Sequence, residues 1–429
     1  MAKRTPFPAV FWVANSVEVL ERFAYYGIYM GFGIYMESLG YSRDQLGVIQ
    51  SLFLFLSYVT PVISGTFADR YGFKKVLIVS YLAYLPSILL LILTRSFSGI
   101  ALTMLSIGLA AGIFKPLISA TVRAVTDGSN KTLGFGIFYA MVNVGATFGP
   151  IVAGKLRATS WNHAFMAAAI GVALMLLITL FFYKEPSRQL QGITLNQKLK
   201  EIYTTLADLK FLAFLVLLGL FFWLPFWAFF NLLAMYIDKH LDTARLYLEI
   251  RSVLGVSVAD FLSQADKGTG VRRILGETIS QDGYIIMFFQ LPISALVQRV
   301  RPIPAFLVGL AIAASGFVVL GCSAASVPSL VFLGIILFGI GEMIASPRIQ
   351  EYITWLAPKE KAGLYMGSNF LATGIGGATS GIYTSLYGHI EKAGHPGYVW
   401  YILAGHLVVG IAAIGLFTKV AGEFHERKE

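Results

Sequence analysis

Long apolar segments recur along this chain, and they constrain its fold more than any other feature. Only 13% of its 429 residues are charged, whereas an average soluble domain carries about 25%. About twelve segments are long enough to cross a bilayer as helices, around residues 7–36, 46–68, 76–94, 99–121, 134–155, 163–183, 211–236, 282–300, 303–323, 328–354, 362–388 and 398–418. We therefore predict an all-α, polytopic, integral membrane protein.

The charges between these segments predict the orientation of the chain. An even number of spans places both termini on the same side of the membrane. If that side is the cytoplasm, the inner segments carry most of the lysine and arginine residues that lie outside the spans, as in other membrane proteins. We expect both termini to be cytoplasmic, with the protein in the inner (plasma) membrane. The same bias explains the net charge of +10, so we expect the lipid bilayer and no nucleic acid as a partner.

A polar stretch divides the spans into six and six. This pattern predicts an N-terminal six-helix bundle over residues 1–183, a cytoplasmic linker over 184–210 and a C-terminal six-helix bundle over 211–429. The second bundle would include a long extracytoplasmic loop, 238–281. Within that loop, Leu241–Leu262 has spaced apolar residues and mixed charge, which predicts an amphipathic surface helix.

Three ionisable side chains, Glu18, Glu21 and Arg22, stand in the middle of the first apolar segment. At 100° per residue, Glu18 and Arg22 fall on one stripe with Tyr25 and Tyr29, and Glu21 lies beside it. A charge at the centre of a spanning helix costs about 2.5–3.5 kcal/mol on insertion scales, and such residues usually serve a function. The alternative is a fixed structural ion pair between Glu18 and Arg22, which are four residues apart.

Lys115, Glu342 and Arg348 are also placed inside apolar segments. Ionisable residues inside membrane spans usually serve a function. Arg348 lies closer to the cytoplasmic end of its segment, so the alternative is that it pairs there with Glu351 or extends to the interface.

Enzyme, metal and cofactor chemistry is not indicated. The single cysteine, Cys322, excludes an intrachain disulfide and a cysteine-rich metal site. No two of the six histidines have the spacing of a helical ligand pair, and no P-loop is present. We expect no enzyme, no metal and no cofactor, and any pumping would use an ion gradient.

Residues Gly65–Lys75 contain Gly65, Asp69, Arg70 and Gly72 in a pattern that resembles the G-x-x-x-D-R-x-G signature of the major facilitator superfamily. The resemblance implies the major facilitator fold, with two six-helix bundles and transport by alternating access. It also implies that Asp69 and Arg70 belong to a cytoplasmic gating turn, in which Gly72 allows the bend.

Glu18–Gly27 matches the E-x-x-E-R-F-x-Y-Y-G signature of the proton-dependent oligopeptide transporters at every fixed position. Ile113–Pro116, Phe138–Gly145 and Gly341–Pro347 resemble further elements of that family. The resemblance implies a proton-coupled symporter, in which Glu18, Glu21, Arg22 and Lys115 couple the proton. The residues that it suggests for substrate binding are Tyr25, Tyr26, Tyr29, Asn143, Trp227, Asn231, Glu342 and Arg348. For the aromatic residues among them, simple helix packing is the alternative.

The chain departs from that family at the positions expected to hold a peptide. Tyr29 stands where the family has an arginine that helps to bind a carboxylate, and Phe226–Asn231 lacks the usual acidic residue. We therefore expect protons and a small peptide-like molecule as partners, either a di- or tripeptide or a related zwitterionic solute, and a monomeric protein.

Two other classes of function stay open. Gly136, Gly145, Gly149 with Pro150, and Gly154 resemble the pattern of drug antiporters, so the alternative is a proton-coupled exporter of drugs or metabolites. A membrane receptor or scaffold with a transporter-like fold is the third class, although it would not need so many buried charges. The direction of substrate movement relative to a proton gradient separates the first two.

Overall fold

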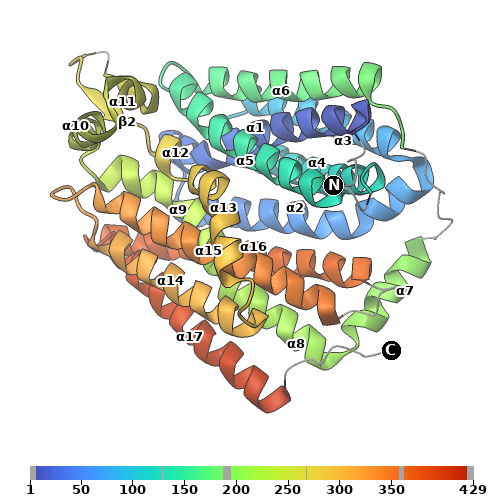
Figure 1. The fold of residues 1–429 in the computed structure, drawn as a ribbon. Coiled ribbons are helices and arrows are strands. Elements are labelled where there is room, and N and C mark those ends of the chain that lie inside the picture. The colour runs from blue at the N-terminus through green and yellow to red at the C-terminus, as the bar shows by residue number, and fades with distance from the viewer. Residues whose placement is uncertain (1–5, 128–129, 187–194, 267, 357–361, 423–429) are drawn as a thin grey trace. The chain divides into compact units, whose positions relative to one another are not determined.

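The computed structural model describes residues 6–127, 130–186, 195–266, 268–356 and 362–422, and these residues are almost entirely helical (Figure 1). Nine helices among them have the length and hydropathy of membrane spans. Helix α1 (Ala9–Ser38) is not among the nine, because three ionisable groups lie in its middle. Helix α13 (Gly283–Val297) is not among them either, because it has only 15 residues. Each of the twelve expected segments is helical where it is described, which confirms the predicted all-α membrane architecture.

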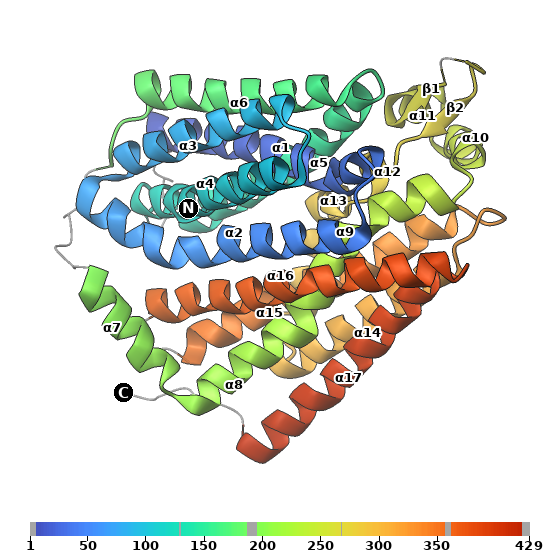
Figure 2. The ribbon, with the colours of Figure 1, turned by 180° about the vertical axis from the view of Figure 1, so that it is seen from behind.

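The chain divides into two compact units, Met1–Phe32 with Leu52–Glu201, and Gly33–Ser51 with Ile202–Glu429. In the first unit the helices run side by side (Figures 1 and 2). Besides most of α1, it contains α2 (Arg43–Tyr71) from Leu52 onward, α3 (Phe73–Leu93), α4 (Phe97–Ala124), α5 (Lys131–Arg157) and α6 (Trp161–Phe182). Of the predicted linker, residues 187–194 lie outside the described part, and α7 (Leu195–Leu206) follows them.

Glycines let α5 approach α1 closely. A side chain at Gly145 would meet the Cβ atom of Arg22 at 2.6 Å and the backbone carbonyl of Val19 at an even shorter distance. A side chain at Gly149 would meet the Cα atom of Phe23 at 2.9 Å. Small residues of this kind allow backbone-to-backbone packing in membrane bundles. The α5 glycines therefore fix the position of the α1 segment that carries the ionisable residues.

The second unit is built around a helix pair with similar contacts. Its spans after α9 (Leu224–His240) are α13, α14 (Pro302–Cys322), α15 (Leu330–Leu356), α16 (Ala362–Lys392) and α17 (Tyr398–Ala421). A side chain at Gly309 of α14 would meet the carbonyl oxygen of Gly341 at 2.7 Å, and one at Gly316 would meet the backbone nitrogen of Phe338 at 2.7 Å. These contacts hold α14 against α15, the helix that carries Glu342 and Arg348.

One span of this unit is not a regular α-helix. It runs through α8 (Leu209–Leu218), a π-helical turn η1 (Gly219–Trp223) and α9 (Leu224–His240) without a break. Side chains at Gly219 and Gly376 would meet Ile375 and Trp223 respectively, so the turn packs tightly on α16.

Residues 33–51 belong to the second unit because they bond to its helices. Arg43 lies 3.0 Å from Glu37 and 3.5 Å from Glu391 of α16, and Lys239 of α9 lies 3.2 Å from the same Glu391. Gly47 and Gly381 also touch through their backbones. A network of several charges is more effective than an isolated surface pair.

The loop between α9 and α13 forms a small layer beyond the end of α9 (Figure 1). It contains α10 (Thr243–Leu254), α11 (Val256–Leu262), the antiparallel strands β1 (Ser263–Ala265) and β2 (Arg272–Ile274), and α12 (Gly276–Ile279). The expected single amphipathic helix is two helices, because Gly255 between them adopts φ +86°.

The turn between β1 and β2 was not expected from the sequence. Asp266 accepts hydrogen bonds from the backbone amides of Thr269 and Gly268, both at 2.9 Å. These hydrogen bonds lower the pKa of the Asp266 carboxyl below its usual value. The carboxylate thus fixes the turn that pairs the two strands.

Candidate functional site

Arg22 contacts two of the three carboxylates of α1, Glu18 and Glu21. Its Nε atom lies 2.8 Å from Glu18 Oε1, with which it forms a hydrogen bond, and 3.1 Å from Glu21 Oε2. The exposed fractions of Glu18, Glu21 and Arg22 are 1%, 0% and 7%. The predicted stripe of ionisable residues is therefore sealed within the first unit.

The two carboxylates differ in their hydrogen bonding. Glu18 Oε1 accepts a hydrogen bond from Arg22, whereas neither oxygen of Glu21 has a hydrogen-bond partner among the described residues. A buried carboxylate without hydrogen bonds depends on its ionic partner, because desolvation costs several kcal/mol per ion. Of these two carboxylates, Glu21 is therefore the one whose negative charge is less stabilised.

Lys115 of α4 completes the group. Its Nζ atom lies 4.2 Å from the ring centroid of Tyr25 and 4.6 Å from that of Tyr58, and it has no hydrogen-bond partner among the described residues. Lys115 also interacts electrostatically with Glu21 and Arg22. A cation over two ring faces is stabilised by their quadrupoles. The cluster of Glu18, Glu21, Arg22 and Lys115, called the α1–α4 cluster below, holds two acidic and two basic groups.

Tyrosines cover one side of the α1–α4 cluster. The Tyr25 ring lies 5.1 Å from Tyr26 and 6.0 Å from Tyr29, centroid to centroid. Tyr58 of α2 was missed by sequence reasoning, because it stands in an apolar run with no charge or motif beside it. Only the packing of α2 against α4 brings its ring to Lys115.

Asn143 of α5, expected as a substrate contact, is buried. Its side-chain amide donates a hydrogen bond of 2.9 Å to the Tyr139 carbonyl one turn earlier on the same helix. Its exposed fraction is 6%, so in this conformation the side chain is buried and bonds within its own helix.

The expected residues of the second unit lie at separate places. Asn231 donates a hydrogen bond of 3.1 Å to the Ser380 hydroxyl, and Trp227 packs edge-to-face against Phe226. Arg348 bonds to Glu351 and to backbone carbonyls after α13, including that of Gln298 at 3.3 Å. Glu342 interacts electrostatically with Asp282, which directly precedes α13.

Asp69 and Arg70, the residues expected in a gating turn, lie in the last turn of α2. Gly72 follows with φ +93°, a conformation that favours glycine. Glu185, which the sequence analysis did not single out, accepts hydrogen bonds from the backbone amides of Phe73 at 2.7 Å and Lys74 at 2.8 Å. This carboxylate therefore ties the start of α3 to the residues that follow α6.

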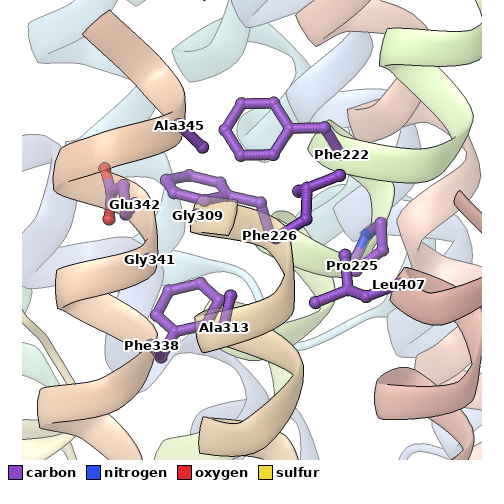
Figure 3. A pocket seen from close by; sticks show the side chains of 11 residues that line it. Phe222, Pro225, Phe226, Gly309, Ala313, Phe338, Gly341, Glu342, Ala345 and Leu407 are labelled. Atoms are coloured by element: carbon purple, nitrogen blue, oxygen red, sulfur yellow. The ribbon is translucent and has the colours of Figure 1, made fainter. Parts of the chain in front are cut away.

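Two cavities are lined by residues other than those of the α1–α4 cluster. One, of about 670 Å³, is an apolar groove of the first unit between α2, α3 and α4, with Lys75 at its margin. The other, with about 10 Å³ of space for water, lies in the second unit among Phe222, Phe226 and Phe338 (Figure 3). Neither cavity contains a member of the α1–α4 cluster, so in this conformation those charges pair with one another.

Comparison with known proteins gives a consistent family assignment. The family model described as Major Facilitator Superfamily matches residues 16–264. The MFS-type transporter YqjV of Bacillus subtilis is 21% identical over 383 residues, which cover 88% of this chain and 86% of that protein. The quinolone resistance protein NorA of Staphylococcus aureus is 23% identical over 169 residues, only 38% of this chain and 43% of that relative.

A solved structure shares the fold over nearly the whole chain. A peptide transporter POT in complex with sulfate superposes with a TM-score of 0.78 at 19% identity, covering 98% of this chain and 96% of the other. At this identity the likeness concerns the fold alone.

Proposed function

Because the chain belongs to the Major Facilitator Superfamily, whose members are transporters and not enzymes, we propose that it is a proton-coupled symporter. It would import di- or tripeptides, or a related small zwitterionic solute, by alternating access. The observation that carries this proposal is the buried α1–α4 cluster, with Arg22 between two carboxylates and Lys115 beside them.

Charge balance gives the cluster a way to bind a proton. With all four groups ionised, two positive charges face two negative ones. A proton on Glu21 removes one negative charge, and Arg22 then keeps only Glu18 as a partner. The excess positive charge attracts an anionic group, such as the carboxylate of a peptide. Proton binding and substrate binding would in this way favour each other.

The peptide-like substrate rests on the first-helix signature and on the relatives. Glu18–Gly27 matches the oligopeptide-transporter signature at every fixed position, and a structure with the same fold is named a peptide transporter. Tyr25, Tyr26, Tyr29 and Asn143 are the proposed contacts of the first unit. Those of the second unit are Trp227, Asn231, Glu342 and Arg348.

The test is uptake of labelled dialanine into liposomes under an imposed pH gradient. We expect Glu21→Gln to abolish accumulation above equilibrium, because a neutral amide cannot take up and release a proton. The matched control is Glu249→Gln, which alters an exposed pair with Arg245 (2.9 Å) on α10 and should leave uptake unchanged. Full pH-driven accumulation by Glu21→Gln would reject the proposed role of this residue.

A proton-coupled exporter is the second candidate, and the similarity to NorA favours it. The test is the direction of movement. In the same liposomes, an antiporter would move a fluoroquinolone against the direction of proton flow, whereas a symporter would carry dialanine with it. A thermal-shift screen of peptides, amino acids and drugs at two pH values would indicate which class binds, because a ligand stabilises the folded protein.

A further inference from the structure

A second acidic pair lies in the second unit, remote in sequence from the α1–α4 cluster: Asp282 is buried and Glu342 is half-buried. Asp282 directly precedes α13, and Glu342 lies in the middle of α15, against which α13 packs. Their carboxyl groups interact electrostatically. Gly339, one turn before Glu342, provides the space: a side chain there would meet the Cβ atom of Asp282 at 3.2 Å.

Asp282 occupies the N-cap position of α13 but does not cap the helix. An aspartate at this position usually accepts a hydrogen bond from a backbone amide of the first turn. Asp282 makes no such hydrogen bond, and its exposed fraction is 3%. Its carboxyl lies against α15 instead, with Oδ2 3.8 Å from the place of a side chain at Gly339.

A hydrogen bond between these two carboxyl groups would require a proton. Ionised carboxylates only accept hydrogen bonds, and no donor among the described residues serves Asp282 Oδ2 or Glu342 Oε2. Two carboxylates in contact at low dielectric repel each other strongly. One proton held between them supplies the missing hydrogen and removes one of the two charges.

Among the described residues of the neighbouring helices, the cations have other partners. On α15, Arg348 is bonded to Glu351 and to carbonyls beyond α13. On α9, Lys239 and His240 lie 3.2 and 3.0 Å from Glu391, and α14 carries no charged residue. The other titratable side chains on these elements are Tyr236, Asp238, Glu277, Tyr284, Cys322 and Tyr352.

We propose that Asp282 and Glu342 form a proton-binding site in the second unit, separate from the α1–α4 cluster, and that they hold one proton between them. Figure 3 shows the Glu342 carboxylate at the edge of the small pocket, apart from the phenylalanine rings. If the proposed symport is correct, on which this part rests, the site would supply a second exchangeable proton to transport.

Infrared spectroscopy of the purified protein, with exchange from H₂O to D₂O, tests the site without any transport. At neutral pH we expect a C=O band of a protonated carboxyl that is lost in Asp282→Asn and also in Glu342→Gln. In either variant the new amide donates to the remaining carboxylate, so a proton is no longer needed. The matched control is Glu351→Gln on α15, which should keep the band. A band that persists unchanged in both variants would overturn the proposal.

A second measurement covers the case in which Asp282→Asn does not fold. The pair loses its proton as the pH rises, and the two charges then repel each other. The melting temperature of the wild type should fall towards alkaline pH, and that of Glu342→Gln should fall less. Equal slopes would reject the site. Both readouts are independent of uptake by Glu21→Gln, so failure of the proposed symport is distinguishable from failure of this pair.

Discussion

At the scale of single residues, the environment of Lys115 is the most informative. A buried ammonium usually hydrogen-bonds to acceptors, yet Lys115 lies between the rings of Tyr25 and Tyr58 and within the field of the α1 carboxylates. Ring faces attract a cation without fixing it in one direction. Lys115 can therefore respond to a change of charge at Glu21 without first breaking a hydrogen bond.

Substitution of Tyr58 tests this contact. Tyr58→Phe and Tyr58→Leu both remove the hydroxyl, but only the phenylalanine keeps a ring for the Lys115 cation. We expect the leucine variant to be less stable than the phenylalanine variant by about 0.5–2 kcal/mol, the range of cation–π contacts. Chemical denaturation in detergent gives both free energies of unfolding. Equal stabilities would show that the ring face contributes nothing.

At the scale of elements, the α1–α5 contact determines where the charges stand. The Arg22 Cβ atom lies where a side chain at Gly145 would have to be placed. Position 145 lies in an ordinary helix, so its backbone conformation does not require glycine. Glycine is needed there because a larger residue would collide with α1. Two glycines of the pattern that resembles drug antiporters, Gly145 and Gly149, thus support the α1 segment.

Gly145→Ala should displace α1 and with it Arg22. We expect a loss of stability of about 1–3 kcal/mol, as for other overpacked sites, and a several-fold loss of pH-driven uptake. Gly136→Ala on the same helix is the control, because a side chain there would meet no atom within 4 Å. Thermal unfolding and liposome uptake measure the two effects. A Gly145→Ala protein as active and stable as Gly136→Ala would contradict the packing argument.

At the scale of the whole molecule, the parts of the fold that depend on local sequence were predictable. Apolar length identified every span, and the spacing of Glu18 and Arg22 placed them together because residues four apart meet on a helix. Asp282 and Tyr58 could not be found in this way, since each meets its partner only through packing between helices. The two strands of the loop depend on a turn held by Asp266, which hydropathy does not detect.

The orientation of the molecule has a simple test. With cytoplasmic termini, α14 runs outward and ends at Cys322 on the extracytoplasmic side. This is the single cysteine of the chain, and it is exposed. We expect a membrane-impermeant maleimide to label intact cells that produce the protein, with Cys322→Ser as the unlabelled control. Labelling only after the cells are opened would reverse the orientation.

The π-helical turn of Gly219–Trp223 changes the direction in which the side chains after it point. A wide turn accommodates one additional residue without rotating the segment that follows. Asn231 thus faces Ser380 one position later than an uninterrupted α-helix would place it. A helical wheel that treats the whole span as one α-helix therefore places each residue after the turn about 100° away from its actual direction. Loss of one residue within the turn would keep the Asn231–Ser380 hydrogen bond, whereas the same loss within α9 would swing the amide away from it.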